Sequence, residues 1–174
     1  MPLVEVIRCD DTDQEALDIG FAFVKGIGKL PLECKSAPGF VVNRILAPYM
    51  AEAMHLHEDG VSLVDIDRAA ERFGMPMGPL ALLDEVGLDV ALHVSEVLLA
   101  AFPGRGEPPN VLKPMVEGGR LGKKNGRGFY LYSSSGKKPD PAVYQHFLQR
   151  SGAQANEAWL ISSNPFDVIG AINV

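Results

Sequence analysis

The stretch SAPGFVVNRILAPYM, residues 36–50, governs the interpretation of the whole chain. Serine, proline and glycine predict a turn at its start, and the apolar residues that follow recur at helical spacing. These apolar positions are Val42, Ile45, Leu46, Tyr49, Met50 and Ala53. The opposite face is also mostly apolar, which predicts a central helix. The polar pair Asn43 and Arg44 in its first turn therefore needs an explanation.

Residues 1–37 are expected to form a β-α-β unit ahead of this helix. Residues 2–8 alternate and are rich in β-branched side chains, which predicts a strand, and residues 30–35 are expected to form a second strand. Between them, Thr12 followed three residues later by Glu15 is a capping box that predicts a helix start. Two strands and one helix cannot bury both faces of a sheet. The unit is therefore expected to belong to something larger or to need a partner.

From residue 38 to residue 132 the chain is expected to form a mainly helical domain. Ser62 predicts a helix cap and Pro79 a first helical residue, because serine accepts backbone hydrogen bonds and proline suits the first turn. The helices expected after the central one cover residues 62–73, 79–86, 88–102 and 111–118. The basic, glycine-rich segment LGKKNGRGFYLY is predicted to be a loop that leads into an extended stretch.

Residues 133–174 are expected to form a third region. Residues 133–141 have the composition of a solvated linker, rich in serine, lysine and proline. A short helix is expected near residues 141–150, and residues 151–174 show no firm periodicity.

Charge and composition disfavour several classes of function. The 174 residues carry a net charge of −6, which argues against a general nucleic-acid binder because phosphate backbones require a basic surface. No apolar run approaches the ~20 residues of a membrane-spanning helix, and the N-terminus turns acidic too soon for a secretory signal. Cys9 and Cys34 have no metal-ligand spacing and are interpreted as free buried thiols. The expected compartment is therefore reducing and cytoplasmic.

The sequence lacks the common motifs for metals and nucleotides. Among the four histidines there is no H-E-x-x-H, and His55 and His57 point in different directions on a helix, so no metal site is predicted. No G-x-G-x-x-G follows a strand and no P-loop is present, so no cofactor-binding residue is assigned. Lys123, Lys124 and Arg127 are interpreted as a solvated loop rather than as a phosphate site.

Two polar residues in apolar surroundings are candidates for chemistry. Glu5 lies in the middle of the first strand; it either faces solvent or, if buried, needs a partner, which in catalysis is usually a histidine. Asn43 is either a local cap or solvated, or it donates to a ligand carbonyl in a dry cleft. The spacing alone leaves both alternatives open.

The segments LVEVI, PGFVVNR, MPMGPLALLDEVGLD and GKKNGRGFY together resemble the 3-hydroxyacyl-CoA dehydrogenases. The resemblance covers about residues 1–132. MPLVEVI and GFYLYSSSGKKPDPAVY look closest to the multifunctional α-subunits of bacterial fatty-acid oxidation complexes. The resemblance implies a helical domain of the 6-phosphogluconate dehydrogenase C-terminal type, preceded by a β-α-β remnant of a Rossmann sheet.

The same resemblance implies roles for three residues. In the family a histidine, oriented by a glutamate, takes the proton of the 3-hydroxyl while a hydride passes to NAD, and Glu5 matches that glutamate. Asn43 matches the asparagine that holds and polarises the substrate oxygen, which would explain a polar residue in the first turn. Met77 is carried over as a substrate-binding residue. Arg44 is left as a structural residue that pairs with a carboxylate.

The expected function is that of the substrate-binding and dimerisation part of an NAD-dependent enzyme that oxidises 3-hydroxyacyl-CoA to 3-oxoacyl-CoA in fatty-acid β-oxidation. The histidine and the glycine-rich NAD-binding fold have no match in the sequence, so the chain alone is expected to be inactive and to bind no NAD. A homodimer, also favoured by exposed strand edges, and a thiolase subunit are the expected partners. The alternatives are a stand-alone module for dimerisation or acyl-CoA binding, and a dehydrogenase of another hydroxy acid.

Overall fold

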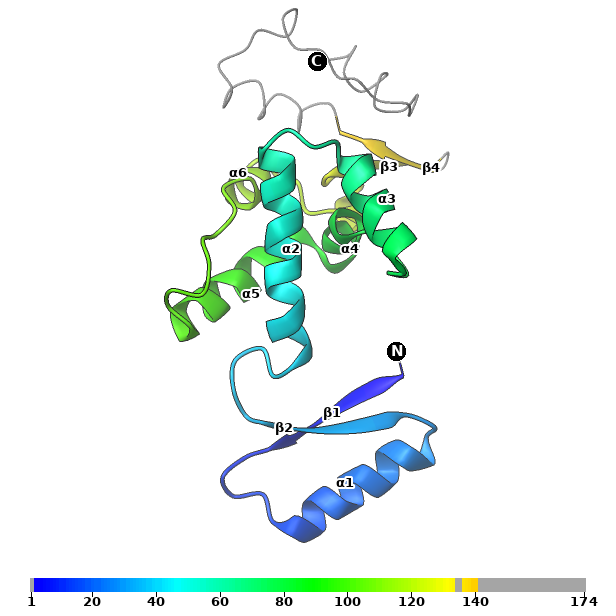
Figure 1. Cartoon of the computed structure of the whole chain (residues 1–174), viewed down its shortest axis with the longest axis vertical. Helices are drawn as coiled ribbons and strands as arrows, with labels where there is room; N and C mark the ends of the chain where they lie inside the picture. Colours follow the sequence, from blue (N-terminus) through cyan, green and yellow to red (C-terminus); the bar gives the residue numbers. More distant parts are fainter. Residues whose placement is uncertain (1, 134–135, 141–174) are drawn as a thin grey trace, which may run out of the picture.

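The computed structural model describes residues 2–133 and 136–140, which form a small β-α-β unit and a larger helical part (Figure 1). The elements in chain order are β1 (Leu3–Arg8), α1 (Gln14–Gly26), β2 (Leu30–Lys35), α2 (Val42–Glu58), α3 (Leu63–Phe73), α4 (Pro79–Val86), α5 (Leu88–Ala101), α6 (Leu112–Glu117), the 3-10 turn η1 (Lys123–Asn125), β3 (Tyr130–Ser133) and β4 (Gly136–Pro139). The mainly helical fold with a β-α-β start is confirmed.

The β-α-β unit consists of two parallel strands with one helix against them. β1 and β2 pair in register, with Glu5 opposite Leu32. Leu17 and Val24 are buried on the face of α1 that packs on the strands. The helical part stands on the other side of the strands (Figure 1). The sheet of this unit has only these two strands in the described residues, so both of its edges lack a paired strand there.

Two predictions for this unit are wrong in detail. Asp13, not Thr12, caps α1, because its side chain accepts a hydrogen bond of 2.7 Å from the backbone N–H of Ala16. The Thr12 hydroxyl instead accepts from the backbone N–H of Cys9 at 3.0 Å, which forms the turn before the helix. Cys34 is buried as predicted, but Cys9 is exposed, because it follows the end of β1.

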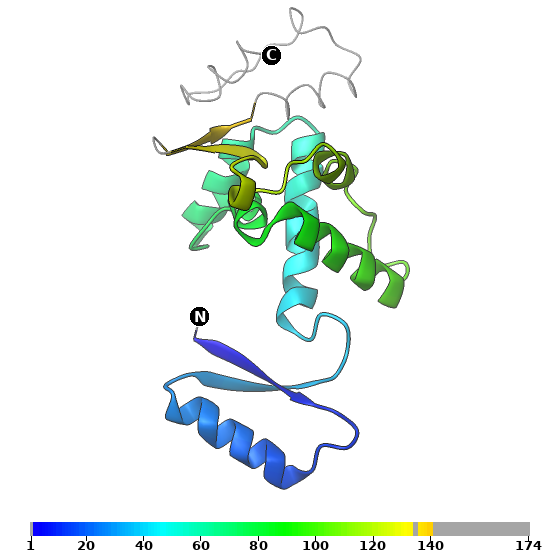
Figure 2. The ribbon, with the colours of Figure 1, turned by 180° about the vertical axis from the view of Figure 1, so that it is seen from behind.

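The helical part is built around α2, which is the long central helix in both views, with α3 on one side and α5 and α6 on the other (Figures 1 and 2). The α2 helix continues through Pro48. The core of the helical part is one cluster of buried apolar residues, which come from the helices α2 to α6 and from β3 and the residues before these elements. They are Met50, Ala53, Met54, Leu63, Ile66, Leu80, Ala81, Leu83, Leu88, Val111, Leu112, Met115, Phe129 and Tyr130. Burial of this cluster supplies the main driving force for folding.

The predicted helix boundaries in this part are confirmed where their signals are local. The Ser62 side chain accepts from the backbone N–H of Asp65, as a cap does, and Pro79 is the first residue of α4. Gly87 separates α4 from α5 at a φ of 103°, a conformation that favours glycine. Residues 133–141 are not simply a linker, because β4 pairs antiparallel with β3. The helix expected near residues 141–150 lies outside the described residues.

Two buried aspartates join segments that are far apart in the sequence. Asp67 on α3 accepts hydrogen bonds from the backbone N–H groups of Leu80 and Ala81, at 2.8 and 3.0 Å, and so caps the first turn of α4. The hydroxyl of Tyr130 donates to the same carboxylate at 2.8 Å. One side chain thus fixes α3, α4 and the hairpin relative to one another.

Asp84, near the end of α4, holds the glycine-rich segment. It accepts from the backbone N–H groups of Phe129 and Tyr130, both at 2.9 Å, and from the hydroxyl of Tyr132 at 3.0 Å. Both of its oxygens are therefore used. Burial raises the pKa of Asp84 from 3.8 to about 6, although these hydrogen bonds act in the opposite direction. Within the described residues, no helix is long and apolar enough to cross a membrane.

Candidate functional site

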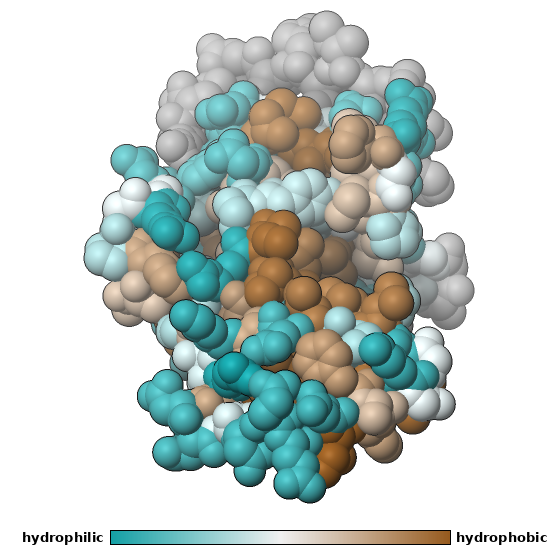
Figure 3. All heavy atoms as spheres, turned by 60° about the horizontal axis from the view of Figure 1, so that its bottom comes forward, coloured by the Kyte–Doolittle hydropathy of each residue, from teal (hydrophilic) through white to brown (hydrophobic). Residues whose placement is uncertain are grey.

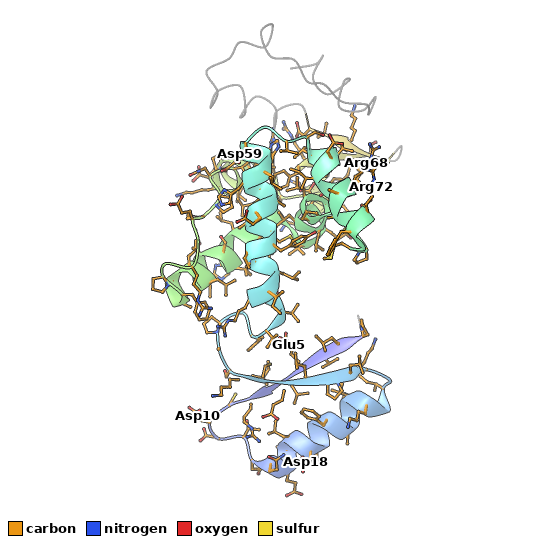
Figure 4. The ribbon with its side chains drawn as sticks, in the orientation of Figure 1. Glu5, Asp10, Asp18, Asp59, Arg68 and Arg72 are labelled. Carbon is orange, nitrogen blue, oxygen red and sulfur yellow. The ribbon has the colours of Figure 1, made fainter. Side chains whose placement is uncertain are left out.

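The strongest candidate for a functional site lies where β1 meets the start of α2. Glu5 points from β1 toward α2 (Figure 4). Its Oε1 accepts hydrogen bonds from the backbone N–H groups of Val41 and Val42, at 2.7 and 3.0 Å. Val41, the N-cap residue of α2, has a side chain that cannot cap the helix. A carboxylate from another element therefore satisfies the unpaired N–H groups and complements the positive end of the helix dipole.

The turn before α2 explains how this contact forms. Gly39 and Phe40 both adopt left-handed conformations, with φ of 73° and 43°. A side chain at Gly39 would meet the side chains of Leu98 and Arg44, so only glycine fits here. The turn redirects the chain from β2 and aims the first N–H groups of α2 at β1. The turn predicted from the sequence thus decides where the start of α2 points, which the spacing of residues along the chain did not reveal.

Neither interpretation of Glu5 from the sequence anticipated this geometry. Glu5 is half-buried and has a backbone partner rather than a solvent-facing position. Its second oxygen, Oε2, makes no hydrogen bond within residues 2–133 and 136–140. A helix end holds one oxygen in place, and the other oxygen remains available to accept a proton donor, such as a histidine ring N–H.

Asn43 is the second residue of α2 and is exposed. Asn43 directly follows Val42, whose backbone N–H donates to Glu5. The two polar candidates therefore meet at the first turn of α2. Within the described residues no hydrogen bond joins them, and the Asn43 side chain has no polar partner. The amide is thus free to bind a ligand group.

The other sequence candidates lie elsewhere. Met77 is 36% exposed in the connector between α3 and α4. Arg44 pairs with no carboxylate of the described residues; its guanidinium lies over the ring of Phe102, 4.3 Å from the ring centroid.

The basic loop is held by ion pairs, which supports the interpretation that it is not a phosphate site. Lys123 pairs with Glu85 at 2.7 Å, and Lys124 pairs with Asp89. Arg127 pairs with Asp140 at 2.9 Å. Among the described residues no group of three or more potential ligands could hold a metal ion.

Comparisons with known proteins cover both parts of the chain. Residues 39–132 match the family model described as 3-hydroxyacyl-CoA dehydrogenase, C-terminal domain, and residues 1–37 match the NAD binding domain of the same enzyme. The chain is 42% identical over 145 residues to the fatty acid oxidation complex subunit alpha of Vibrio vulnificus. That alignment covers 83% of this chain and 21% of the relative, so the chain spans about a fifth of the length of that protein.

Solved structures show the same fold. The chain is similar to (S)-3-hydroxybutyryl-CoA dehydrogenase PaaH1 from Ralstonia eutropha, with 43% identity, a TM-score of 0.71, and coverage of 77% of this chain and 48% of that one. FadB2 of M. tuberculosis gives 41% identity and a TM-score of 0.71, covering 76% of this chain and 48% of that one. The division of the matches near residue 38 coincides with the turn that leads into α2.

Proposed function

The chain belongs to the 3-hydroxyacyl-CoA dehydrogenase family, and from this membership we propose that it forms the substrate-binding and dimerisation part of an NAD-dependent enzyme that oxidises 3-hydroxyacyl-CoA to 3-oxoacyl-CoA. The observation that carries the proposal is the contact between Glu5 and the start of α2. It supports the proposal because the Glu5 carboxylate binds the two residues directly before Asn43. Of the proteins named above, one is a subunit of a fatty acid oxidation complex and one is an (S)-3-hydroxybutyryl-CoA dehydrogenase.

Glu5 has the role of a positioning residue in this proposal. Its Oε1 is held by two backbone N–H groups, so the carboxylate is fixed and its Oε2 can accept from a histidine. An ionised carboxylate in this position selects one tautomer of the ring and stabilises the imidazolium that forms when the ring takes the proton of the 3-hydroxyl. The histidine itself has no match in the 174 residues.

Asn43 is the residue proposed to touch the substrate. Its amide N–H₂ would donate to the oxygen at carbon 3, where negative charge develops when the 3-oxo group is reduced or the hydroxyl is deprotonated. Met77, exposed in the connector after α3, is proposed as an apolar contact for the acyl part. Met side chains adapt to varied apolar shapes.

NAD would supply the hydride chemistry in the complete enzyme. The residues of this chain do not by themselves fit a dinucleotide, because the sequence has no G-x-G-x-x-G after a strand and the described parallel sheet has only β1 and β2. We therefore propose that residues 1–37 complete an NAD-binding domain and that the chain alone is inactive. The exposed apolar strip on α1 and at the start of β2 supports this; it consists of Ile19, Phe23, Ile27 and Leu30.

The space-filling view with the bottom of Figure 1 turned forward shows a hydrophobic area near the middle of this face, while hydrophilic residues cover most of its lower part (Figure 3). Apolar groups left in water are unfavourable by roughly 25 cal/mol per Å², so such surfaces usually meet a partner. A homodimer and a thiolase subunit of a fatty-acid oxidation complex are proposed as further partners, from the family and from the relative in Vibrio vulnificus.

A chimaera tests the proposal. The part of the Ralstonia eutropha dehydrogenase that precedes its matched region is joined to residues 1–174, and reduction of acetoacetyl-CoA is followed through NADH absorbance. The chimaera should turn over, whereas the chain alone should not. Asn43→Ala should lower kcat at least 100-fold, the lower end of what removal of such a polarising donor costs, with little change in stability. Lys25→Gln, an exposed change on α1, should leave kcat unchanged.

Two results would refute the proposal. Turnover by the unfused chain would contradict its role as a part. A chimaera that folds and binds NADH but gives no turnover, while the chain alone binds acetoacetyl-CoA, would favour the stand-alone binding module.

A further inference from the structure

A cleft of about 400 Å³ lies between α2, α5 and the segment 102–109, with Arg44, the neighbour of Asn43 on α2, in its lining. Glu5, Asn43 and Met77 do not line it. The segment that leaves α5 turns back toward α6 (Figure 1), and its residues 105–109 line the cleft. His55 ties this segment to α2, because its Nε2 lies 3.2 Å from the backbone oxygen of Glu107 and its Nδ1 lies 3.4 Å from the carboxylate of Glu58. The volume is within the range of small-molecule sites, about 300–1,000 Å³.

The long walls of the cleft are aliphatic. The lining residues without charge include Ala47, Pro48, Ala51, Leu98 and Leu99. Alanine at two successive turns of α2 keeps the cleft open, since a larger residue at either position would project into it. The walls therefore suit an aliphatic chain.

One end of the cleft carries two guanidinium groups on one aromatic ring. Arg44 lies 4.3 Å and Arg105 lies 5.2 Å from the ring centroid of Phe102. Neither arginine forms an ion pair within the described residues. A guanidinium that stacks on a ring uses its flat face for the ring, and its N–H donors point outward in the plane. Such donors suit an anion, and above all a carboxylate, bound through paired hydrogen bonds.

The acidic residues of the lining are Glu52 and Glu107. Glu52 is eight residues beyond Arg44 on α2, a rise of about 12 Å along the helix axis. Glu107 is two residues beyond Arg105, and its backbone oxygen lies 3.2 Å from His55 Nε2. A molecule with one negative end and an apolar remainder is thus attracted at Arg44 and repelled at Glu52, which favours one orientation along α2.

We propose that this cleft binds an aliphatic carboxylate, with the carboxylate on Arg44 and Arg105 and the chain along Ala47 and Ala51. Two guanidinium groups already lie over the ring of Phe102, which leaves less of that ring for a flat base to stack on. This site does not depend on the proposed dehydrogenase function, because it shares none of the residues assigned to it.

Calorimetric titration of the full chain with sodium octanoate tests the proposal. One molecule should bind per chain, and neutral octanol should bind at least tenfold more weakly because it lacks the charge-assisted hydrogen bonds. Arg105→Gln and Arg44→Gln should each weaken octanoate binding by about tenfold or more, the effect of removing a charged hydrogen bond. Arg72→Gln is the matched control, since Arg72 lies on α3, away from this wall (Figure 4), and should leave binding unchanged.

Several outcomes would overturn the proposal. Equal binding of octanol and octanoate, or an equal loss in Arg72→Gln, would show that no specific carboxylate site exists. Sedimentation of the same variants distinguishes the main competing occupant, a second copy of the chain. If Arg105→Gln dissociates a dimer and octanoate does not bind, the cleft is an interface. Since binding is read without NADH, a failure here leaves the chimaera experiment unaffected.

Discussion

The hydroxyl of Tyr130 donates a hydrogen bond of 2.8 Å to the carboxylate of Asp67, across 63 residues of sequence. Tyr130 is almost fully buried, and its hydroxyl also lies 3.2 Å from the backbone oxygen of Leu63. Burial and the neighbouring Asp67 raise the pKa of the Tyr130 hydroxyl above its ordinary value of 10.0, so it stays protonated and a donor at neutral pH. This contact ties the hairpin to α3 through the core.

Tyr130→Phe should therefore lower the free energy of unfolding by about 1–2 kcal/mol, because Asp67 keeps its burial and loses a donor. Tyr132→Phe is the matched control: its hydroxyl donates to Asp84 at 3.0 Å, but the side chain is only half-buried. Water can partly replace it, and the loss should be about 0.5 kcal/mol. Urea unfolding measures both, and equal losses would show that burial does not set the difference.

Gly128→Ala should be among the most damaging small substitutions in the chain. A Cβ at Gly128 would overlap the Asp84 carboxylate, which is fully buried and cannot move without breaking its bonds to Phe129 and Tyr130. We expect a loss of about 3 kcal/mol or more in unfolding free energy. Gly26→Ala at the end of α1 meets nothing within 4 Å and should be neutral or slightly stabilising. Similar losses in both variants would contradict the clamp.

Asp84 should make stability depend on pH in a direction unusual for a carboxylate. The pKa of Asp84 is raised to about 6 in the folded protein, whereas an aspartate in the unfolded chain has the ordinary value of 3.8. Between these values the folded state binds more protons than the unfolded state, so this group stabilises the fold more as the pH falls from 6 toward 4. Most paired carboxylates do the reverse.

A carbon-13 label on the aspartate carboxyl groups would report the Asp84 titration directly by NMR, with a midpoint near pH 6. Asp84→Asn removes the titration but places an N–H₂ against a backbone donor, so the variant is destabilised throughout. The gap in unfolding free energy between wild type and this variant should widen toward pH 4. A constant gap, or a midpoint near 4, would contradict the raised pKa.

Glu5→Ala should destabilise the junction between β1 and α2 by about 1–2 kcal/mol, since two N–H groups at a helix start lose their acceptor. Glu5→Gln keeps an acceptor oxygen without the charge and should lose roughly half as much. Glu33→Ala is the control on the neighbouring strand, where the carboxylate forms only an exposed ion pair with Arg8 and should change little. Chemical denaturation followed by circular dichroism measures all three variants. If Glu33→Ala has the larger effect, the cap is not a stabilising contact.

Local signals in the sequence were sufficient for most elements. The period of the apolar residues predicted α2, Ser62 and Pro79 predicted the starts of α3 and α4, and Gly87 predicted the break before α5. These signals act over one or two turns, because a cap or a helix-incompatible φ depends only on neighbouring residues. At the start of α1 the sequence predicted Thr12 as the cap, whereas Asp13 holds that position in the structure.

The site and the long-range contacts needed tertiary structure. For Glu5, the sequence shows only that a charged residue lies among apolar neighbours in a strand. Its partners are the backbone N–H groups of Val41 and Val42, which every residue except proline carries, so no residue type identifies them. The same holds for Asp84, which accepts a hydrogen bond from the backbone of Phe129, 45 residues further along the chain. The sequence by itself determined which segments become helices and strands and which residues are candidates for chemistry. Only the folded chain decided which candidate meets which backbone, because hydrogen bonds between distant segments depend on how apolar faces pack.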